Sequence, residues 1–388
     1  MLLRSSYPLS LPSTQSIARS RREFLGLMSK ATAASALFGS SPLRAKPSPR
    51  KRKVVIVTFG GGARDEETFA PEGQENIPHL MTALLPRSTF FAQVVNRGIL
   101  GHYVATTSLA TGVYETLNNF SGDAPASPTL FECYRKDLRR PMEDAWVVSP
   151  SRGFAHMGGS TAKHYGPAYG AGVILPKDLL SAAAPSGSVD DILHLLRDSY
   201  EEPYFSPDLS GNEGQLQQLE NLLKLSVGDF RQHAMTVGSA DELSVYVARR
   251  LMEEVSPTLL WVTLHDIDVA HSGTYSLYID GIRRTDRLCL EIWQAIQANP
   301  EYQSNTTMFI LPDFGRDSDM NPGGNGFQHH RTGDALSRTT WMMVLGAGIR
   351  EGAFIERPVD SLDLVPTVAR LLGFNVPNAQ GHVLGEVV

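Results

Sequence analysis

The chain has 388 residues, 42% of them hydrophobic, and its 35 Lys and Arg against 41 Asp and Glu give a formal net charge of −6. This acidic balance argues against a nucleic-acid partner, because nucleic acids are bound through clustered basic side chains. The two cysteines, Cys133 and Cys289, are too few for a disulfide framework and lack metal-binding spacing, so we expect them to be buried small hydrophobes.

The segment 1–45 has the features of a twin-arginine export signal. An Arg21-Arg22 pair precedes a short apolar stretch at 31–39, and small residues follow. A bilayer span needs about 20 apolar residues, so this stretch is too short for a permanent anchor. We therefore expect the segment to engage the twin-arginine export machinery and to be removed, leaving the protein in the periplasm or cell envelope.

Removal of the segment leaves roughly 340 residues, 46–388, without a second hydrophobic span. The formal charge becomes −11, because the segment contains six of the Lys and Arg but only one of the Asp and Glu. This length suits one large α/β domain and no stable membrane span. Residues 150–235 are irregular and rich in Gly, Ala and Ser, which predicts a long excursion from that domain.

Apolar, β-branched runs alternate with amphipathic stretches along the domain. The predicted strands are 53–59, 145–148, 259–264, 307–311 and 341–345, and the predicted helices are 130–139, 189–200, 215–225, 240–255 and 275–298. This alternation predicts an α/β fold with a largely parallel central sheet and helices on both faces.

Asp, His and Gly gather directly after several predicted strands, where open α/β sheets bind ligands. Three such clusters occupy 60–65, 265–273 and 313–317, and two adjacent histidines precede the strand at 341–345. Carboxylates and neutral imidazoles are ligands that zinc accepts, so the clusters predict an open hydrolytic metal site. The triple glycine at 60–62 lacks the Lys-Ser/Thr of a phosphate loop, and it predicts a tight turn or a close backbone approach.

Six short sequence motifs occur along the chain from residue 76 to residue 373. They are NIPHL at 76–80 with FFAQVVN at 90–96, SLATGVY at 108–114, DVAHSG at 268–273, DFG at 313–315, a histidine ahead of the strand at 341–346, and DSLDLVPT at 360–367 with LLG at 371–373. In this order they resemble the motifs of the alkaline phosphatase and sulfatase superfamily over roughly residues 53–388. The resemblance implies an alkaline-phosphatase-like α/β/α sandwich.

The resemblance also implies a metal-dependent hydrolase of phosphate or sulfate esters. Family members bind two metals, of which one activates a nucleophile while both stabilise the displacement. The implied ligands of the first metal are Asp268 or Asp266, with His271 and either His329 or His330. The family spacing places the Asp four residues before the His, whereas Asp268 and Asp266 lie three and five before His271. The motif as a whole favours Asp268.

The second metal position departs from the family pattern. Phe59 and Gly60 stand nearest to the position of the family's first-strand Asp, leaving Asp65 as a distant substitute. Phe314 stands where the family has a His, so Asp313 is the main ligand that this position retains. The pattern therefore predicts one divalent ion, with zinc suiting the ligands best.

The catalytic residues implied by the resemblance depart as well. The family's nucleophile position falls on His102, with Thr106 or Thr107 about one helical turn on. His102 would act as a general base or an extra metal ligand, Asp313 as a ligand or an orienting residue, and Arg316 as an electrostatic partner for a tetrahedral anion.

Two functions fit these observations. The first is an exported hydrolase of small anionic esters that uses a single metal. The alternative is a non-catalytic relative that serves as a binding or scaffold protein of the envelope. An open cavity around His102, Asp313, Arg316 and Asp268 would favour the hydrolase, whereas filling by Phe59 and Phe314 would favour the alternative. A dehydrogenase has little support, because no G-x-G-x-x-G follows the first strand.

Overall fold

The computed structural model describes residues 51–120, 122–182, 220–320, 324–331 and 333–388. The proposed export signal at 1–45, the predicted helix 189–200 and the start of the predicted helix 215–225 lie outside these residues. The division into a removed segment and a single domain therefore stays a prediction.

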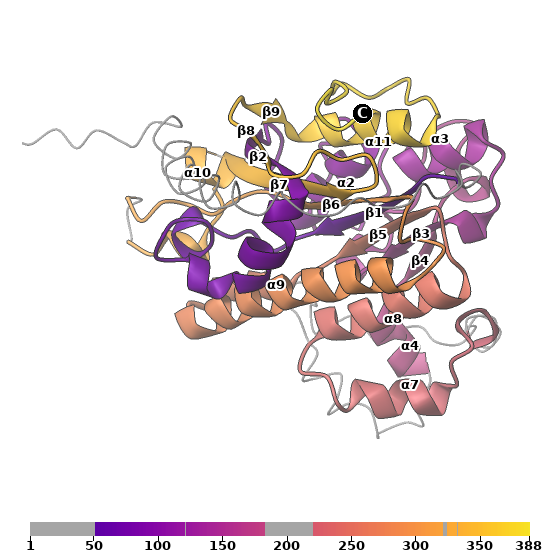
Figure 1. Ribbon diagram of the computed structural model, residues 1–388, viewed down its shortest axis with the longest axis horizontal. Coiled ribbons are helices and arrows are strands. Elements are labelled where there is room, and N and C mark those ends of the chain that lie inside the picture. Colours follow the sequence, from indigo (N-terminus) through magenta and orange to yellow (C-terminus); the bar gives the residue numbers. More distant parts are fainter. Residues whose placement is uncertain (1–50, 121, 183–219, 321–323, 332) are drawn as a thin grey trace, which may run out of the picture.

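A nine-stranded sheet forms the centre of the described structure (Figure 1). Its strands are β1 (Lys53–Thr58), β2 (Ser88–Val95), β3 (Ala145–Val148), β4 (Gly172–Ile174), β5 (Leu259–Thr263), β6 (Thr306–Leu311), β7 (Thr339–Gly346), β8 (Ala353–Ile355) and β9 (Val359–Asp360). Their order is β4-β3-β5-β1-β6-β7-β2-β8, and β9 pairs with β2. Only the two pairings of β7 are antiparallel, so the predicted largely parallel sheet is confirmed.

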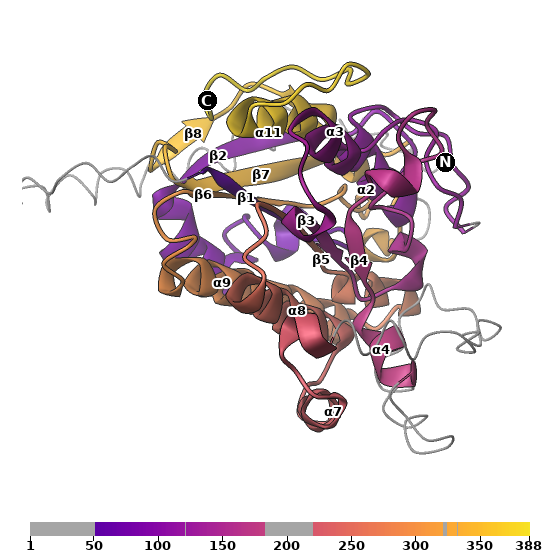
Figure 2. The same cartoon turned by 90° about the vertical axis from the view of Figure 1, so that its right-hand side faces the viewer.

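Helices cover both faces of the sheet, as predicted (Figures 1 and 2). The helices are α2 (His102–Thr111), α3 (Leu130–Asp137), α4 (Pro176–Ala182), α7 (Val227–Ala234), α8 (Ala240–Glu254), α9 (Tyr275–Ala298), α10 (Ala335–Arg338) and α11 (Leu364–Leu372). Alternate residues of β1 face opposite sides, as the pleat of a strand requires. Val55 and Val57 pack with α8 and α9, whereas Val54 and Ile56 pack with α2, α3 and α11.

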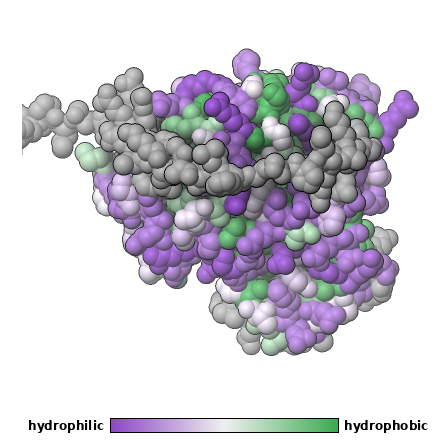
Figure 3. All heavy atoms as spheres, in the orientation of Figure 1, coloured by the Kyte–Doolittle hydropathy of each residue, from purple (hydrophilic) through white to green (hydrophobic). Residues whose placement is uncertain are grey.

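The polar sides of the outer helices face solvent. Figure 3 shows a mostly hydrophilic described surface on this face, with small apolar patches. Among the described residues, no helix combines the length and apolar content needed to cross a membrane. Both cysteines are buried and free. They cannot pair, because Cys133 of α3 and Cys289 of α9 are buried in the cores on opposite sides of the sheet.

All five predicted strands are present, as β1, β3, β5, β6 and β7. The predicted helices 130–139, 240–255 and 275–298 are present as α3, α8 and α9. The helix α2 was implied by the family resemblance of 108–114, but it was not visible as a helical period, because all ten of its residues are buried and it has no polar face. Strand β2 was not predicted, although its central run is apolar.

Candidate metal centre

The carboxyl ends of β5, β1 and β6 meet at one edge of the sheet. Thr58, the last residue of β1, pairs with Thr263 of β5 and Leu311 of β6. Asp268 and His271 lie in the 3-10 helix η9 (Asp266–Ser272) that follows β5, and the loop after β6 carries Asp313 and Arg316. The start of α2 brings His102 to the same edge, and the loop before α10 brings His330.

Four side chains form a compact cluster at this edge. Each of His102, Asp268, His271 and His330 offers one ligand atom, and all four atoms lie within 4.8 Å of one another. Asp268 Oδ1 lies 2.9 Å from His102 Nε2 and 3.2 Å from His271 Nε2, and the Nε2 atoms of His271 and His330 lie 2.9 Å apart. Tetrahedral zinc with bonds of about 2.0–2.1 Å needs ligand atoms about 3.3 Å apart. The donor set therefore fits one metal ion.

His330 is held in the form that binds a metal. Its Nδ1 lies 2.8 Å from the backbone oxygen of Leu100. Because a carbonyl can only accept, Nδ1 carries the hydrogen and the lone pair of Nε2 faces the cluster. Burial, followed by the positive charges of His102 and Arg316, lowers the pKa of His330 to about 2. The ring is therefore neutral at physiological pH.

The 3-10 geometry of η9 explains the irregular motif spacing. Side chains three residues apart overlie one another in a 3-10 helix, and this places Asp268 beside His271. Burial acts to raise the pKa of Asp268, but the charge and hydrogen bond of His102, together with His271, hold it well below its usual range. Asp268 is therefore ionised, the form in which a carboxylate can bind a metal.

His102 lies on the buried side of Asp268. Its Nδ1 is 2.6 Å from Asp313 Oδ2, and the ring is fully buried. Burial lowers the pKa of His102, but the carboxylates of Asp268 and Asp313 outweigh burial and raise it to about 9. Phe314 stacks on the ring with centroids 4.5 Å apart. This side of the site is closed by the protein's own side chains.

Arg316 lies between Asp268 and the triple-glycine loop. Its Nη2 donates to Asp268 Oδ1 at 2.9 Å and to the oxygen of Gly61, and its Nε donates to the oxygen of Gly62 at 2.9 Å. Gly61 has φ +93°, and a Cβ there would lie 2.5 Å from the backbone nitrogen of Asp268. Only glycine permits this approach, so the loop is the close backbone approach that was predicted.

Other candidates lie outside the cluster. The carboxylate of Asp266 pairs with Arg284 on α9 at 2.8 Å. His329 has an extended backbone, so its side chain and that of His330 point to opposite sides. Thr106 is fully buried one turn along α2, and its hydroxyl makes no hydrogen bond to a described residue. Asp65 lies half-buried in the 3-10 turn η2 (Asp65–Glu67).

Two further residues support the cluster and were not identified from the sequence. His265 is buried with its Nε2 3.5 Å from Asp268 Oδ2; its place directly after β5 was the available signal. Asp241 of α8 accepts hydrogen bonds at 2.8 Å from the backbone N–H groups of His265 and Asp266. Burial, followed by the nearby Asp266, raises the pKa of Asp241 well above its usual value. In the sequence, Asp241 resembles an ordinary acidic residue in the first turn of a helix.

Phe59 and Phe314, the two aromatic residues that were considered as fillers of the site, lie in different places. Phe59 packs in the core with its ring centroid 5.4 Å from that of Trp341, whereas Phe314 covers His102. Six of the predicted residues thus converge, namely His102, Asp268, His271, Asp313, Arg316 and His330, but Phe314 fills the side next to His102 and Asp313.

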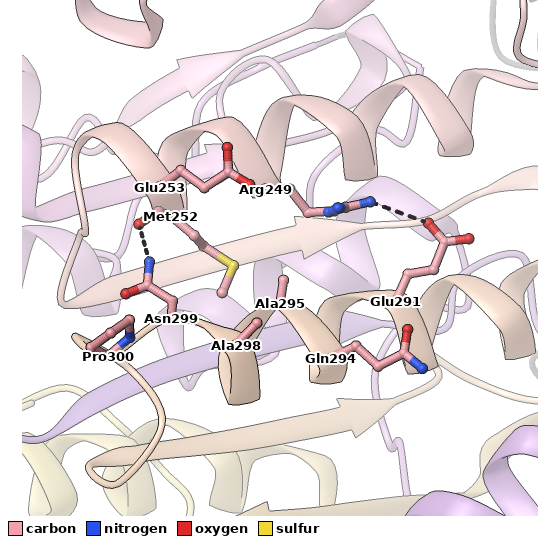
Figure 4. A pocket seen from close by; sticks show the side chains of 9 residues that line it. All are labelled: Arg249, Met252, Glu253, Glu291, Gln294, Ala295, Ala298, Asn299 and Pro300. Atoms are coloured by element: carbon pink, nitrogen blue, oxygen red, sulfur yellow. Dashed lines mark hydrogen bonds and ion pairs between the residues drawn. The ribbon is translucent and has the colours of Figure 1, made fainter.

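A concave region lies between α8 and α9, away from the cluster (Figure 4). This groove of about 510 Å³ is lined by the carboxyl-terminal halves of both helices, which lead into the starts of β5 and β6. It therefore lies at the edge of the sheet opposite the cluster. Its charged residues Arg249 and Glu291 lie 3.9 Å apart and largely offset each other, so the groove offers no comparable chemistry.

Comparison with known proteins supports the fold. No family model matches the chain, and no curated protein matches it in sequence. A protein of the alkaline phosphatase superfamily from Vibrio parahaemolyticus is 12% identical, with TM-score 0.51, over 96% of this chain and 78% of that one. The alkaline phosphatase PafA is 12% identical, with TM-score 0.52, over 88% and 100%. The phosphonate monoester hydrolase SpPMH from Silicibacter pomeroyi is 13% identical, with TM-score 0.52, over 87% and 76%. The chain therefore has the alkaline-phosphatase-like fold that its motifs predicted.

Proposed function

We propose that the protein is an exported hydrolase of phosphate or sulfate esters that uses a single divalent ion held by Asp268, His271 and His330. The observation that carries the proposal is the approach of three ligand atoms, with the two Nε2 atoms 2.9 Å apart and Asp268 Oδ1 3.2 Å from His271 Nε2. Two imidazoles and one carboxylate form a ligand set of catalytic zinc sites. The folds of known hydrolases of such esters agree with this proposal.

The protein's own groups prepare this site for an ion. Leu100 fixes the ring of His330, and Arg316 fixes the carboxylate of Asp268. The side chain of His271 is 39% exposed, so solvent and an ester can approach from its side. A divalent ion supplies Lewis-acid activation of water and of the ester's phosphoryl or sulfuryl oxygen.

Arg316 supports an anionic substrate. The guanidinium is buried, and its Nη1 makes no hydrogen bond to any described residue. Because Nη1 is enclosed by protein, Arg316 supports an anionic substrate through its positive charge beside Asp268 and not through a direct hydrogen bond.

Export is proposed from the segment 1–45. Its Arg21-Arg22 pair and short apolar stretch support delivery to the periplasm or cell envelope. The substrate expected there is a small anionic ester.

Metal analysis combined with an ester panel tests the proposal. The wild type is expected to bind about one ion per chain and to hydrolyse at least one class among aryl phosphates, phosphodiesters and aryl sulfates. His330→Ala should lose both properties, because it removes a ligand. His329→Ala is the matched control and should retain both. Wild-type protein without stoichiometric metal and without hydrolysis would sink the proposal.

A non-catalytic binding protein of the envelope is the second candidate. It is favoured by His102, which stands at the family's nucleophile position and is held against two carboxylates beneath Phe314. Such a protein would bind the ion but hydrolyse none of the three ester classes.

A further inference from the structure

On the buried side of Asp268, the imidazole of His102 lies between the carboxylate of Asp313 and the metal cluster. Asp313 Oδ2 lies 2.6 Å from His102 Nδ1. At the other end of the ring, His102 Nε2 lies 2.9 Å from Asp268 Oδ1 and belongs to the same compact group of ligand atoms as His271 and His330. The ring therefore presents one nitrogen to Asp313 and the other to the cluster.

His102 and His330 are held in the same way. A metal-binding histidine usually donates its second ring N–H to a carboxylate or a backbone carbonyl, which orients the ring and makes its other nitrogen a better ligand. His330 has the oxygen of Leu100 as this partner, at 2.8 Å, and His102 has Asp313. Each ring thus has the support that a ligand needs.

A second ion does not fit beside Asp313. Its Oδ2 faces His102, its Oδ1 accepts from the backbone nitrogen of Phe314 at 3.1 Å, and Phe314 itself offers no donor atom. At the end of β1, a Cβ on Gly60 would lie 2.0 Å from the oxygen of Leu264. A side-chain ligand at that position is therefore excluded, and Phe59 is buried against Trp341.

We propose that His102 is the fourth protein ligand of the single ion, and that Asp313 is a positioning residue that orients His102 instead of binding a second ion. The inference rests on the metal site of the proposed function, but it does not require hydrolysis. Its consequence is a ligand set of three imidazoles and one carboxylate. Catalysis would then need an additional coordination position, because four protein ligands alone complete a closed site.

X-ray absorption spectroscopy of zinc-loaded protein counts the imidazoles directly. The wild type is expected to show three imidazole ligands and His102→Gln two. The matched control His329→Gln, which changes a neighbouring histidine outside the cluster, should keep three. Two imidazoles in the wild type, or three in a folded His102→Gln, would overturn the inference.

The role of Asp313 is tested by zinc titration, and this test survives even if His102→Gln does not fold. Asp313→Asn keeps the volume of the side chain, so it should still bind one ion, about 10- to 100-fold more weakly, as loss of an outer carboxylate usually does. A wild type that binds two ions, with Asp313→Asn binding one, would overturn the inference. So would an affinity unchanged in Asp313→Asn.

Failure of the inference can be separated from failure of the proposed function. Loaded wild type with three imidazoles and no hydrolysis contradicts only the proposed activity. Loaded, active wild type with two imidazoles contradicts only the inference. Wild type that binds no zinc contradicts both.

Discussion

Asp268 separates two regions of the metal centre that differ in exposure. On one side His271 is 39% exposed and shares a short Nε2 contact with His330. On the other side His102 and Asp313 are almost fully buried, and Phe314 covers the ring. A single carboxylate thus contacts a solvent-accessible imidazole on one side and an internal network of charges on the other. A molecule from solvent can approach only from the side of His271.

The largest losses of stability and zinc binding are expected for a change of Asp268, which contacts both regions. Asp268→Asn removes a ligand and leaves the buried Arg316 without its carboxylate. Breaking a buried ion pair costs about 3–5 kcal/mol, so the free energy of unfolding of metal-free protein should fall by that amount and zinc binding should be lost. Urea unfolding and zinc titration measure the two changes.

Asp266→Asn is the matched control, because Asp266 is two residues away and pairs with the partly exposed Arg284. Partly exposed pairs contribute about 1 kcal/mol or less. Equal losses in both variants would contradict the assignment of Asp268 to the centre of the site.

The buried region should also make stability depend on pH. In metal-free protein the carboxylates of Asp268 and Asp313 overcome burial and raise the pKa of His102 to about 9, whereas the unfolded value is about 6.5. The folded state therefore binds this proton more tightly. Its contribution is complete below pH 6.5 and is lost as the pH rises through 9.

At about 1.4 kcal/mol per pKa unit, this contribution is about 3 kcal/mol. Urea unfolding of metal-free wild type and His102→Gln between pH 6 and pH 10 measures it. The wild type should lose more stability than the variant over this range. Parallel curves would show that the buried region does not hold a proton on His102.

Smaller losses of stability and zinc affinity are expected for a change in the triple-glycine loop at 60–62, which lies against Asp268. Gly61→Ala forces an alanine to φ +93° and brings its Cβ within 2.5 Å of the backbone of Asp268. The left-handed conformation costs about 1–3 kcal/mol, and the displaced Asp268 should bind zinc more weakly. Gly373→Ala has a similar φ of +80° but no neighbour within 4 Å. It should lose stability without losing zinc affinity, and a loss of affinity in both variants would contradict the argument.

The smallest changes of stability and zinc affinity are expected when the aromatic ring that covers His102 is removed. Phe314→Leu removes the ring that stacks on His102, which should cost about 1 kcal/mol of stability and change zinc affinity less than about tenfold. Phe59→Leu removes a comparable contact, with Trp341, away from the site. Thermal unfolding should shift in both variants, and zinc titration only in Phe314→Leu. An equal change of affinity in both would show that Phe314 has no special relation to the site.

Strong local patterns were sufficient for much of the fold. The strand β1 is visible in the sequence as a continuous apolar run, because both of its faces are buried, and α9 is visible because its one buried face repeats with a helical period. The reversed direction of β7 was not predictable, since a buried strand has the same composition in either direction. The helix α2 carries no period because it is buried on all sides.

The candidate site likewise combines features that local sequence patterns predict with features that only packing sets. The alkaline-phosphatase-like order of motifs and the enrichment of Asp and His after the strands can be read from the sequence, because they depend only on residue type and position along the chain. The sequence left Asp266 and Asp268, and likewise His329 and His330, as alternatives. The structure brings Asp268 and His330 into the cluster and leaves Asp266 and His329 outside it, because the 3-10 turn of η9 and the extended backbone at His329 set the direction of each side chain. The contact between His102 and Asp313 was likewise decided by packing, since the two residues are 211 positions apart.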